Sequence, residues 1–289
     1  MAFDPFLYVA LGLGIVAGRV VRPRSPWVGR ATRATIVALV GFLGTLLDGV
    51  AAGALLITIP VALAFAGLIL GTTAAVYFLL ARRESGAIGS PSTPPDVGPI
   101  PFSAVLVAAL IGGFGIGHFV PVPSSLGLTG ALYLLLFLVG FDLKLRWGQM
   151  RGLWLPLTAA VVAAVVSGVL AALVAQSSVT VPLATSLAFG WYTLAGPLVA
   201  ARAGTLLGLV AFLTNFFREN LTMILSPYVG RRLRGAGLAA LGGATSMDTT
   251  LYFVTRYGDE GAAGMSLASG LILTLAAGLV LPIVLALPL

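Results

Sequence analysis

The sequence lacks cysteine altogether and has a single histidine, His118, among its 289 residues. Without cysteine there can be no disulfide, no thiolate metal site and no cysteine nucleophile, and one histidine supplies no cluster that could hold a catalytic metal. Charged residues are also scarce. They make up 9% of the chain, against roughly 25% in soluble globular domains. We therefore expect neither a soluble domain nor a metalloenzyme, and no cofactor is predicted.

Apolar residues are abundant instead, at 59% of the chain with a mean hydropathy of +1.08, which is typical of an integral membrane protein. A membrane-spanning helix needs about 20 such residues. The apolar run that opens the sequence has no basic residue ahead of it, so it lacks the charge order of a secretory signal and is interpreted as a retained span. Eight spans are predicted, at 5–22, 31–51, 54–81, 102–121, 126–142, 153–176, 203–229 and 262–287.

Two further apolar stretches, 182–201 and 235–257, contain many Gly, Ser, Thr and Pro residues. Gly permits unusual backbone angles and Pro197 interrupts helical hydrogen bonding, so we predict that both stretches are broken helices. Their freed amides and carbonyls could bind an ion or a zwitterion if they line a cavity. The alternative is that their small residues serve only close helix packing.

Arginine and lysine positions predict the orientation of the chain in the cytoplasmic membrane, because basic loops stay on the cytoplasmic side. The sequence has four basic clusters, at 19–33, 82–83, 144–151 and 231–234. The first three share the inner side if each intervening span crosses, which leaves the N-terminus outside. The fourth joins them if 182–201 is re-entrant from outside. If 235–257 is re-entrant from inside, the C-terminus is outside; ten full crossings are the alternative.

A stretch rich in Pro, Gly and Ser, ESGAIGSPSTPPDVGPIP at 84–101, carries no apolar periodicity and is predicted to be a linker. It separates an N-terminal unit of three helices, 1–83, from a transmembrane core, 102–289. The core contains both predicted broken segments.

The two halves carry similar glycine motifs. GLGIVAG at 12–18 and LVGFLG at 39–44 are echoed by GGFGIG at 112–117 and FLVGFD at 137–142. Units of three spans would be inverted relative to one another, as in many secondary transporters. Chance similarity between glycine-rich spans would give the same pattern. The expected fold is thus an all-α membrane protein of about eight transmembrane helices with two opposed broken segments, organised as an inverted repeat.

Ionisable groups inside the predicted spans mark a candidate pathway, because a charge at the bilayer centre costs about 2.5–3.5 kcal/mol on insertion scales. Asn215 and Glu219 lie four residues apart and share one helical face. Arg218 could simply neutralise Glu219, although adjacent residues point about 100° apart. Asp48 ends the second span and could instead be an interfacial acid. Asp248 lies within the second broken segment.

At these residues the chain resembles a known family. GWYTLAGPL, AFLTNFFREN and GGATSMDTTLYFVTRYG resemble signature segments of the prokaryotic lysine exporter family, LysO, and LLLFLVGFDLK resembles its fifth-span segment. The resemblance implies export of L-lysine, and of toxic analogues such as thialysine, in exchange for entering cations. It also implies two transport acids, at positions matching Asp48 and Glu219. The family tends to have an acid after the asparagine, where this chain has Phe216.

Residues and resemblance together suggest a mechanism. Lysine would bind between the broken segments, and H+ or Na+ would compete for Glu219 or Asp48 to drive antiport. A homodimer is left open, and nucleic acid is not an expected partner. The candidate ligands are Thr193, Thr245 and Ser246 for the carboxylate, Asn215, Glu219 and Asp248 for the ammonium groups, and Trp191 or Tyr192 for the side chain.

Three other functions were weighed. A symporter for small organic anions should present basic residues at mid-depth, where only Arg218 lies. A channel would need no coupling acids. A membrane enzyme would need a nucleophile and a base, and Ser246 and Asp248 have no His or Lys near them in sequence.

Overall fold

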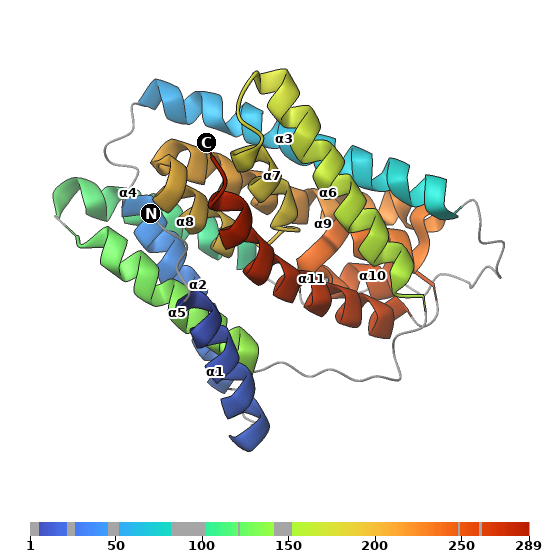
Figure 1. Cartoon of the computed structure of the whole chain (residues 1–289), viewed down its shortest axis with the longest axis horizontal. Helices are drawn as coiled ribbons and strands as arrows, with labels where there is room; N and C mark the ends of the chain where they lie inside the picture. Colours follow the sequence, from blue (N-terminus) through green and yellow to red (C-terminus); the bar gives the residue numbers. More distant parts are fainter. Residues whose placement is uncertain are drawn as a thin grey trace.

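The computed structural model describes residues 6–21, 27–45, 52–81, 102–120, 122–141, 152–247, 249–259 and 262–288. These residues form helices and turns, and no strand occurs among them. Figure 1 shows the arrangement of the helices. In chain order they are α1 (Phe6–Val21), α2 (Trp27–Thr45), α3 (Ala52–Ala81), α4 (Phe102–Phe119), α5 (Ser124–Phe141), α6 (Trp154–Ala175), α7 (Thr180–Leu187), α8 (Tyr192–Ala203), α9 (Thr205–Gly242), the 3-10 helix η2 (Gly243–Met247), α10 (Leu251–Tyr257) and α11 (Ala262–Leu285).

Each predicted span coincides with a helix, and each predicted broken segment coincides with a break. Within the described residues, three helical stretches are long and apolar enough to cross a membrane, at Leu56–Ala81, Trp154–Ala175 and Ala262–Leu285. An all-helical chain with such stretches is typical of a membrane protein. The predicted linker, 84–101, lies outside the described residues, as do Asp48 and Asp248.

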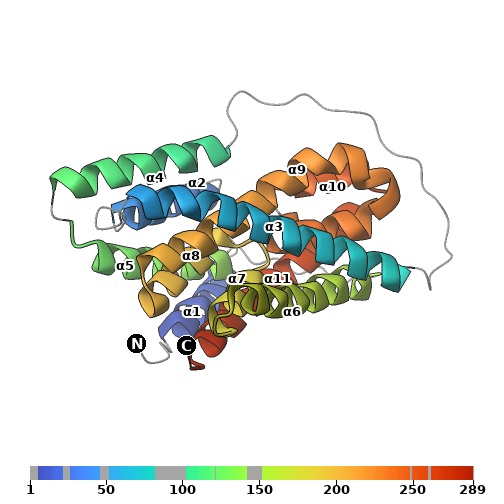
Figure 2. The same ribbon diagram turned by 90° about the horizontal axis from the view of Figure 1, so that it is seen from above.

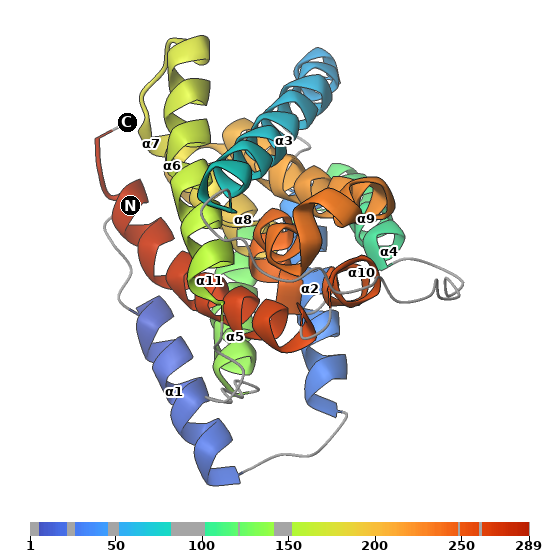
Figure 3. The same ribbon diagram turned by 90° about the vertical axis from the view of Figure 1, so that its right-hand side faces the viewer.

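The first two helices pair with the fourth and fifth through glycine contacts. α1 packs on α5, and α2 packs on α4, as the adjacent ribbons of α2 and α4 show in Figure 2. A Cβ atom at Gly14 would meet the carbonyl oxygen of Phe137, and one at Gly113 would meet that of Gly41. Only glycine allows these backbones to approach so closely. α1 projects from the body of the molecule (Figures 1 and 3).

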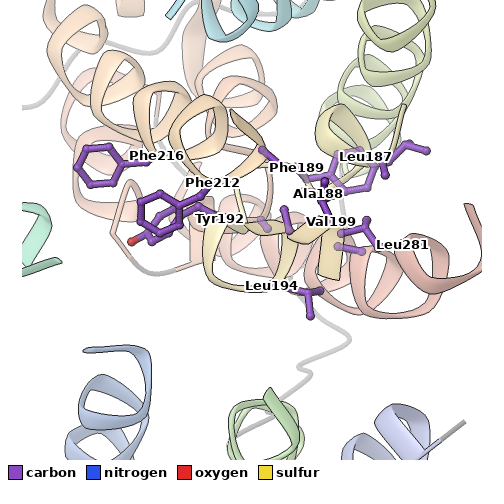
Figure 4. Packing of buried hydrophobic residues seen from close by; sticks show 14 of the residues in the cluster. Leu187, Ala188, Phe189, Tyr192, Leu194, Val199, Phe212, Phe216 and Leu281 are labelled. Atoms are coloured by element: carbon purple, nitrogen blue, oxygen red, sulfur yellow. The ribbon is translucent and has the colours of Figure 1, made fainter. Parts of the chain in front are cut away.

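The helices from α6 to α11 pack together as the body of the molecule, and α3 packs against both α6 and α9. Its core contains an aromatic group in which the Tyr192 ring meets those of Phe212 and Phe216 edge-on, at centroid distances of 5.4 and 5.8 Å. Figure 4 shows this group beside Phe189 and Leu281. The aromatic contacts fix α8 against α9 and so position the break that precedes Tyr192.

α9 consists of two helices in line, because Arg234 has φ 55° and ψ −173°. Such backbone angles interrupt the helical hydrogen bonds. The first part ends at residue 233, slightly beyond the predicted end at 229. The second part, 235–242, begins the second broken segment.

Candidate functional site

The first broken segment, residues 180–203, consists of α7, a tight turn and α8. The turn contains Phe189 with φ 53° and Gly190 with φ 95°. Two consecutive positive φ values cannot continue a right-handed helix, so α8 starts in a new direction. Positive φ at a bulky residue such as Phe189 is unusual, and outliers of this kind persist where the surrounding structure fixes them.

Both ends of this segment lie at the end of α11. The Thr180 hydroxyl donates to the Pro288 carbonyl at 2.5 Å, and the Arg202 guanidinium Nε donates to the Leu285 carbonyl at 2.8 Å. Since the segment begins and ends beside the same few residues, it folds back on itself with the turn as its tip.

The second broken segment, residues 235–257, contains the last part of α9, then η2 and α10. Gly243 breaks the helix with φ 63° and ψ −124°. The Asp259 carboxylate closes this segment at its base: its Oδ1 accepts from the Gly235 amide at 2.8 Å, and its Oδ2 lies 3.7 Å from Arg234 Nε. This segment also folds back on itself.

The two segments point toward each other from opposite ends of α11. The first has its base at the C-terminal end of α11, and the second has its base at the N-terminal end, where the Ala262 amide donates to the Asp259 carbonyl. The 24 residues of α11 span about 36 Å. The tips meet between these ends, where the Ala244 amide donates to the Phe189 carbonyl at 2.8 Å. We call this meeting point the junction (Phe189, Gly190, Gly243 and Ala244).

Asn215 on α9 holds the first segment. Its Oδ1 accepts from the Gly190 amide at 2.8 Å, and its Nδ2 donates to the carbonyls of Thr185 at 2.8 Å and Ala211 at 3.0 Å. The side chain is fully buried. Both functions of the amide are therefore used to fix the backbone of the break.

Arg218, one turn further along α9, holds the second segment. Its Nε donates to the Leu241 carbonyl and its Nη2 to the Ala240 carbonyl, each at 3.1 Å. These are carbonyls at the C-terminal end of a helix, which carries partial negative charge. The guanidinium is fully buried, and its hydrogen bonds among the described residues go to these two carbonyls. The alternative of a self-neutralised pair with Glu219 stays a prediction.

Comparison with known proteins identifies the family. Residues 107–285, more than half of the chain, match the model of a protein family described as "Lysine exporter LysO". The chain belongs to the LysO family. The resemblance seen in the sequence is confirmed, and the matched region contains both broken segments, α9 and α11.

Two relatives carry the family name. "Lysine exporter LysO" of Escherichia coli (strain K12) is 36% identical over 150 residues, covering 50% of this chain and 50% of that protein. "Putative lysine exporter" of Haemophilus influenzae is 26% identical over 150 residues, covering 50% of this chain and 76% of that protein. The match thus spans half the length of the Escherichia coli relative. No solved structure matches the chain.

The remaining predicted ligands in this LysO-family chain lie around the junction. The Thr245 hydroxyl donates to the Gly242 carbonyl at 3.0 Å. The Ser246 hydroxyl lies 2.7 Å from the Gly243 carbonyl and 3.0 Å from the Ser266 carbonyl. Since these hydroxyls already donate, their lone pairs are what they offer to a ligand, which suits an ammonium better than a carboxylate.

Four predicted residues lie at the start of α8 and on α9. Thr193 is buried. Trp191 is half-buried at the break, and Tyr192 is buried in the aromatic group. Glu219 is buried, with 4% of its surface exposed. The structure thus gathers the described candidates around the contact between α9 and the two tips.

The described residues contain no group of three or more His, Cys, Asp or Glu side chains that could hold a metal ion. Sequence reasoning did not single out Phe189, whose carbonyl accepts from the Ala244 amide, or the buried Thr214. The signal available was the run of polar residues at helical spacing on α9, which places Thr214, Asn215 and Arg218 on one side of the helix.

Proposed function

We propose that this chain exports L-lysine, and analogues such as thialysine, across the cytoplasmic membrane by antiport with H+ or Na+. The observation that carries the proposal is the junction: two broken segments from opposite ends of the molecule meet at buried polar groups of α9. Transporter sites are commonly built from such breaks near the middle of the membrane. Membership of the LysO family and the names of two relatives support lysine as the substrate.

In this proposal both broken segments are re-entrant hairpins. The separation of their bases by α11, about 36 Å, is similar to the hydrocarbon thickness of a bilayer. The exposed residues Arg231 and Arg232 precede the base of the second hairpin, which supports placing that base on the cytoplasmic side. The first hairpin and both termini are then on the outer side.

An inverted repeat is also proposed. Its support is the pairing of the glycine motifs: 12–18 packs against 137–142, and 39–44 packs against 112–117. A twofold axis that exchanges the two units would turn one of these pairs into the other. The packing of α3 against α6 agrees, because these third helices of each unit would meet on the axis.

Lysine would reach the junction from the cytoplasm. Glu219 and the lone pairs of Thr245 and Ser246 would receive its ammonium groups, and Trp191 could pack along its methylenes. A cation arriving from outside would then compete for Glu219 or Asp48 and release the substrate. Alternating access would follow from small movements that open the site toward one side at a time.

One observation favours the alternative of a symporter for small organic anions, namely the fully buried guanidinium of Arg218. The two functions differ in substrate charge and in the direction of coupling. In inside-out proteoliposomes the lumen corresponds to the outside of the cell. When the lumen is made acidic or Na+-rich, these vesicles should accumulate radiolabelled lysine and should not accumulate succinate. Accumulation of succinate without lysine would favour the anion symporter, and downhill ion flux that needs no lysine would favour a channel.

A further inference from the structure

Two polar atoms on one face of α9 stand out because both are buried and neither has a hydrogen-bond partner among the described residues: Thr214 Oγ1 and Arg218 Nη1. The residues are four apart, so their side chains are neighbours on the helix surface. Thr214 is 0% exposed and Arg218 is 1% exposed. Buried polar atoms are nearly always paired, and an exception calls for a missing ligand or water.

Thr214 departs from the behaviour of other helical threonines in this chain. The Thr222 hydroxyl donates to the Arg218 carbonyl, and the Thr185 hydroxyl donates to the Val181 carbonyl, each four residues back at 2.8 Å. This bond is the usual way to satisfy a threonine inside a helix. Thr214 makes no such bond, so its hydroxyl remains able to donate to something outside the helix.

Arg218 departs from the behaviour expected of a structural arginine. A guanidinium has five N–H donors, and two backbone carbonyls occupy only Nε and Nη2. Both N–H groups of Nη1 remain. Carbonyl oxygens carry partial charge only, whereas a fully buried cation is compensated best by a carboxylate, which a guanidinium binds through short charge-assisted hydrogen bonds.

We propose that Arg218 Nη1 and Thr214 Oγ1 bind the α-carboxylate of the transported amino acid. This inference rests on the proposed function, since it names the group that orients the substrate in the same site. The guanidinium repels ammonium groups and attracts the carboxylate. It therefore points both ammonium groups of lysine away from Arg218, and Glu219 lies about 100° around the helix to receive one of them.

The consequence is a specificity for free amino acids over diamines. Cadaverine is lysine without its carboxylate, so it brings two ammonium groups and nothing for Arg218 to bind. Wild-type protein should bind lysine roughly 10- to 100-fold more tightly than cadaverine, the range expected for a hydrogen bond to a charged group. Without the guanidinium, this preference should disappear.

The test measures competition by unlabelled lysine and unlabelled cadaverine against radiolabelled lysine in proteoliposomes. In Arg218→Gln, the affinity for lysine should fall at least about tenfold, while the affinity for cadaverine is unchanged or higher. The ratio of the two affinities should therefore approach 1. An equal loss of affinity for both ligands, or an unchanged ratio of affinities, would overturn the proposal. Arg218 would then only stabilise the second hairpin.

Because Arg218→Gln also removes donors from the Leu241 and Ala240 carbonyls, a second variant avoids the hairpin. Thr214→Val keeps the shape of the side chain and should lower the lysine-to-cadaverine ratio several-fold. Thr222→Val, on the same helix with its hydroxyl bonded internally, is the matched control and should keep the wild-type ratio. An unchanged ratio in Thr214→Val would also contradict the proposal.

The outcomes also separate this inference from the proposed function. Wild-type protein that transports lysine but accepts cadaverine equally well refutes only the carboxylate site. Wild-type protein that neither binds nor transports lysine refutes the proposed function and this inference with it.

Discussion

Asn215→Leu is the sharpest test of how α9 fixes the first broken segment. Leucine shares the branching of asparagine at Cγ in a larger side chain, and it neither donates nor accepts hydrogen bonds. The change removes the acceptor of the Gly190 amide and the donor to the Thr185 carbonyl, which lie 2.8 Å from the asparagine. Both backbone groups belong to buried residues, and water is not available to replace the lost bonds.

The expected cost follows from those two groups. A buried donor or acceptor left unpaired costs about 1–3 kcal/mol, so the variant should lose about 2–6 kcal/mol in the free energy of unfolding. For a chain of this size the loss corresponds to a fall in Tm of at least about 4 °C. The third bond, to the Ala211 carbonyl, lies within the same helix and adds little.

Purified protein in detergent would be followed by thermal unfolding, with Asn220→Leu as control. Asn220 is on the same helix and donates only to the Phe216 carbonyl at 2.8 Å, a group that belongs to that helix. The control should change Tm by less than about 2 °C. Equal Tm values for the two variants would refute the argument that Asn215 clamps the break.

Three further predictions concern coupling and the two breaks. Glu219→Gln should abolish gradient-driven lysine accumulation while membrane insertion is retained; full accumulation would remove Glu219 from the mechanism. Gly243→Ala should cost about 1–3 kcal/mol, because φ is 63° and the new Cβ would meet the Phe189 carbonyl; an unchanged Tm in thermal unfolding would contradict this. Asp259→Asn keeps an acceptor for the Gly235 amide and loses only a half-exposed ion pair, so its Tm should stay near wild type, whereas the Tm of Asp259→Leu should fall below it.

Much of the fold was predictable because lipid constrains the sequence strongly. Runs of about 20 apolar residues locate the helices, and the stretches FGWYTLAGPL at 189–198 and GGATSMDTT at 242–250 locate the breaks. The family could also be recognised, because its signature segments coincide with the broken segments and α9. These features are short stretches of consecutive residues, which can be recognised in a single sequence without knowledge of the tertiary contacts.

The detailed geometry of the site was less predictable. Separate partners were favoured for Arg218 and Glu219, but the sequence could not name those of Arg218, because its guanidinium reaches carbonyls more than 20 residues away. Nothing local indicates that Phe189 adopts positive φ, because the strain depends on contact with Ala244 across the junction. Asp48 and Asp248 lie outside the described residues, so their predicted roles stay predictions.

The most direct test of the central claim, that lysine binds where the two tips meet, is protection of a cysteine placed there. The chain has no cysteine, so Thr193→Cys gives a single thiol beside the break, at the start of α8. Ser177→Cys, in the exposed turn before α7, is the control. Lysine should slow alkylation at position 193 several-fold and leave position 177 unaffected. Equal rates with and without lysine at position 193, in a variant that still transports it, would contradict the account.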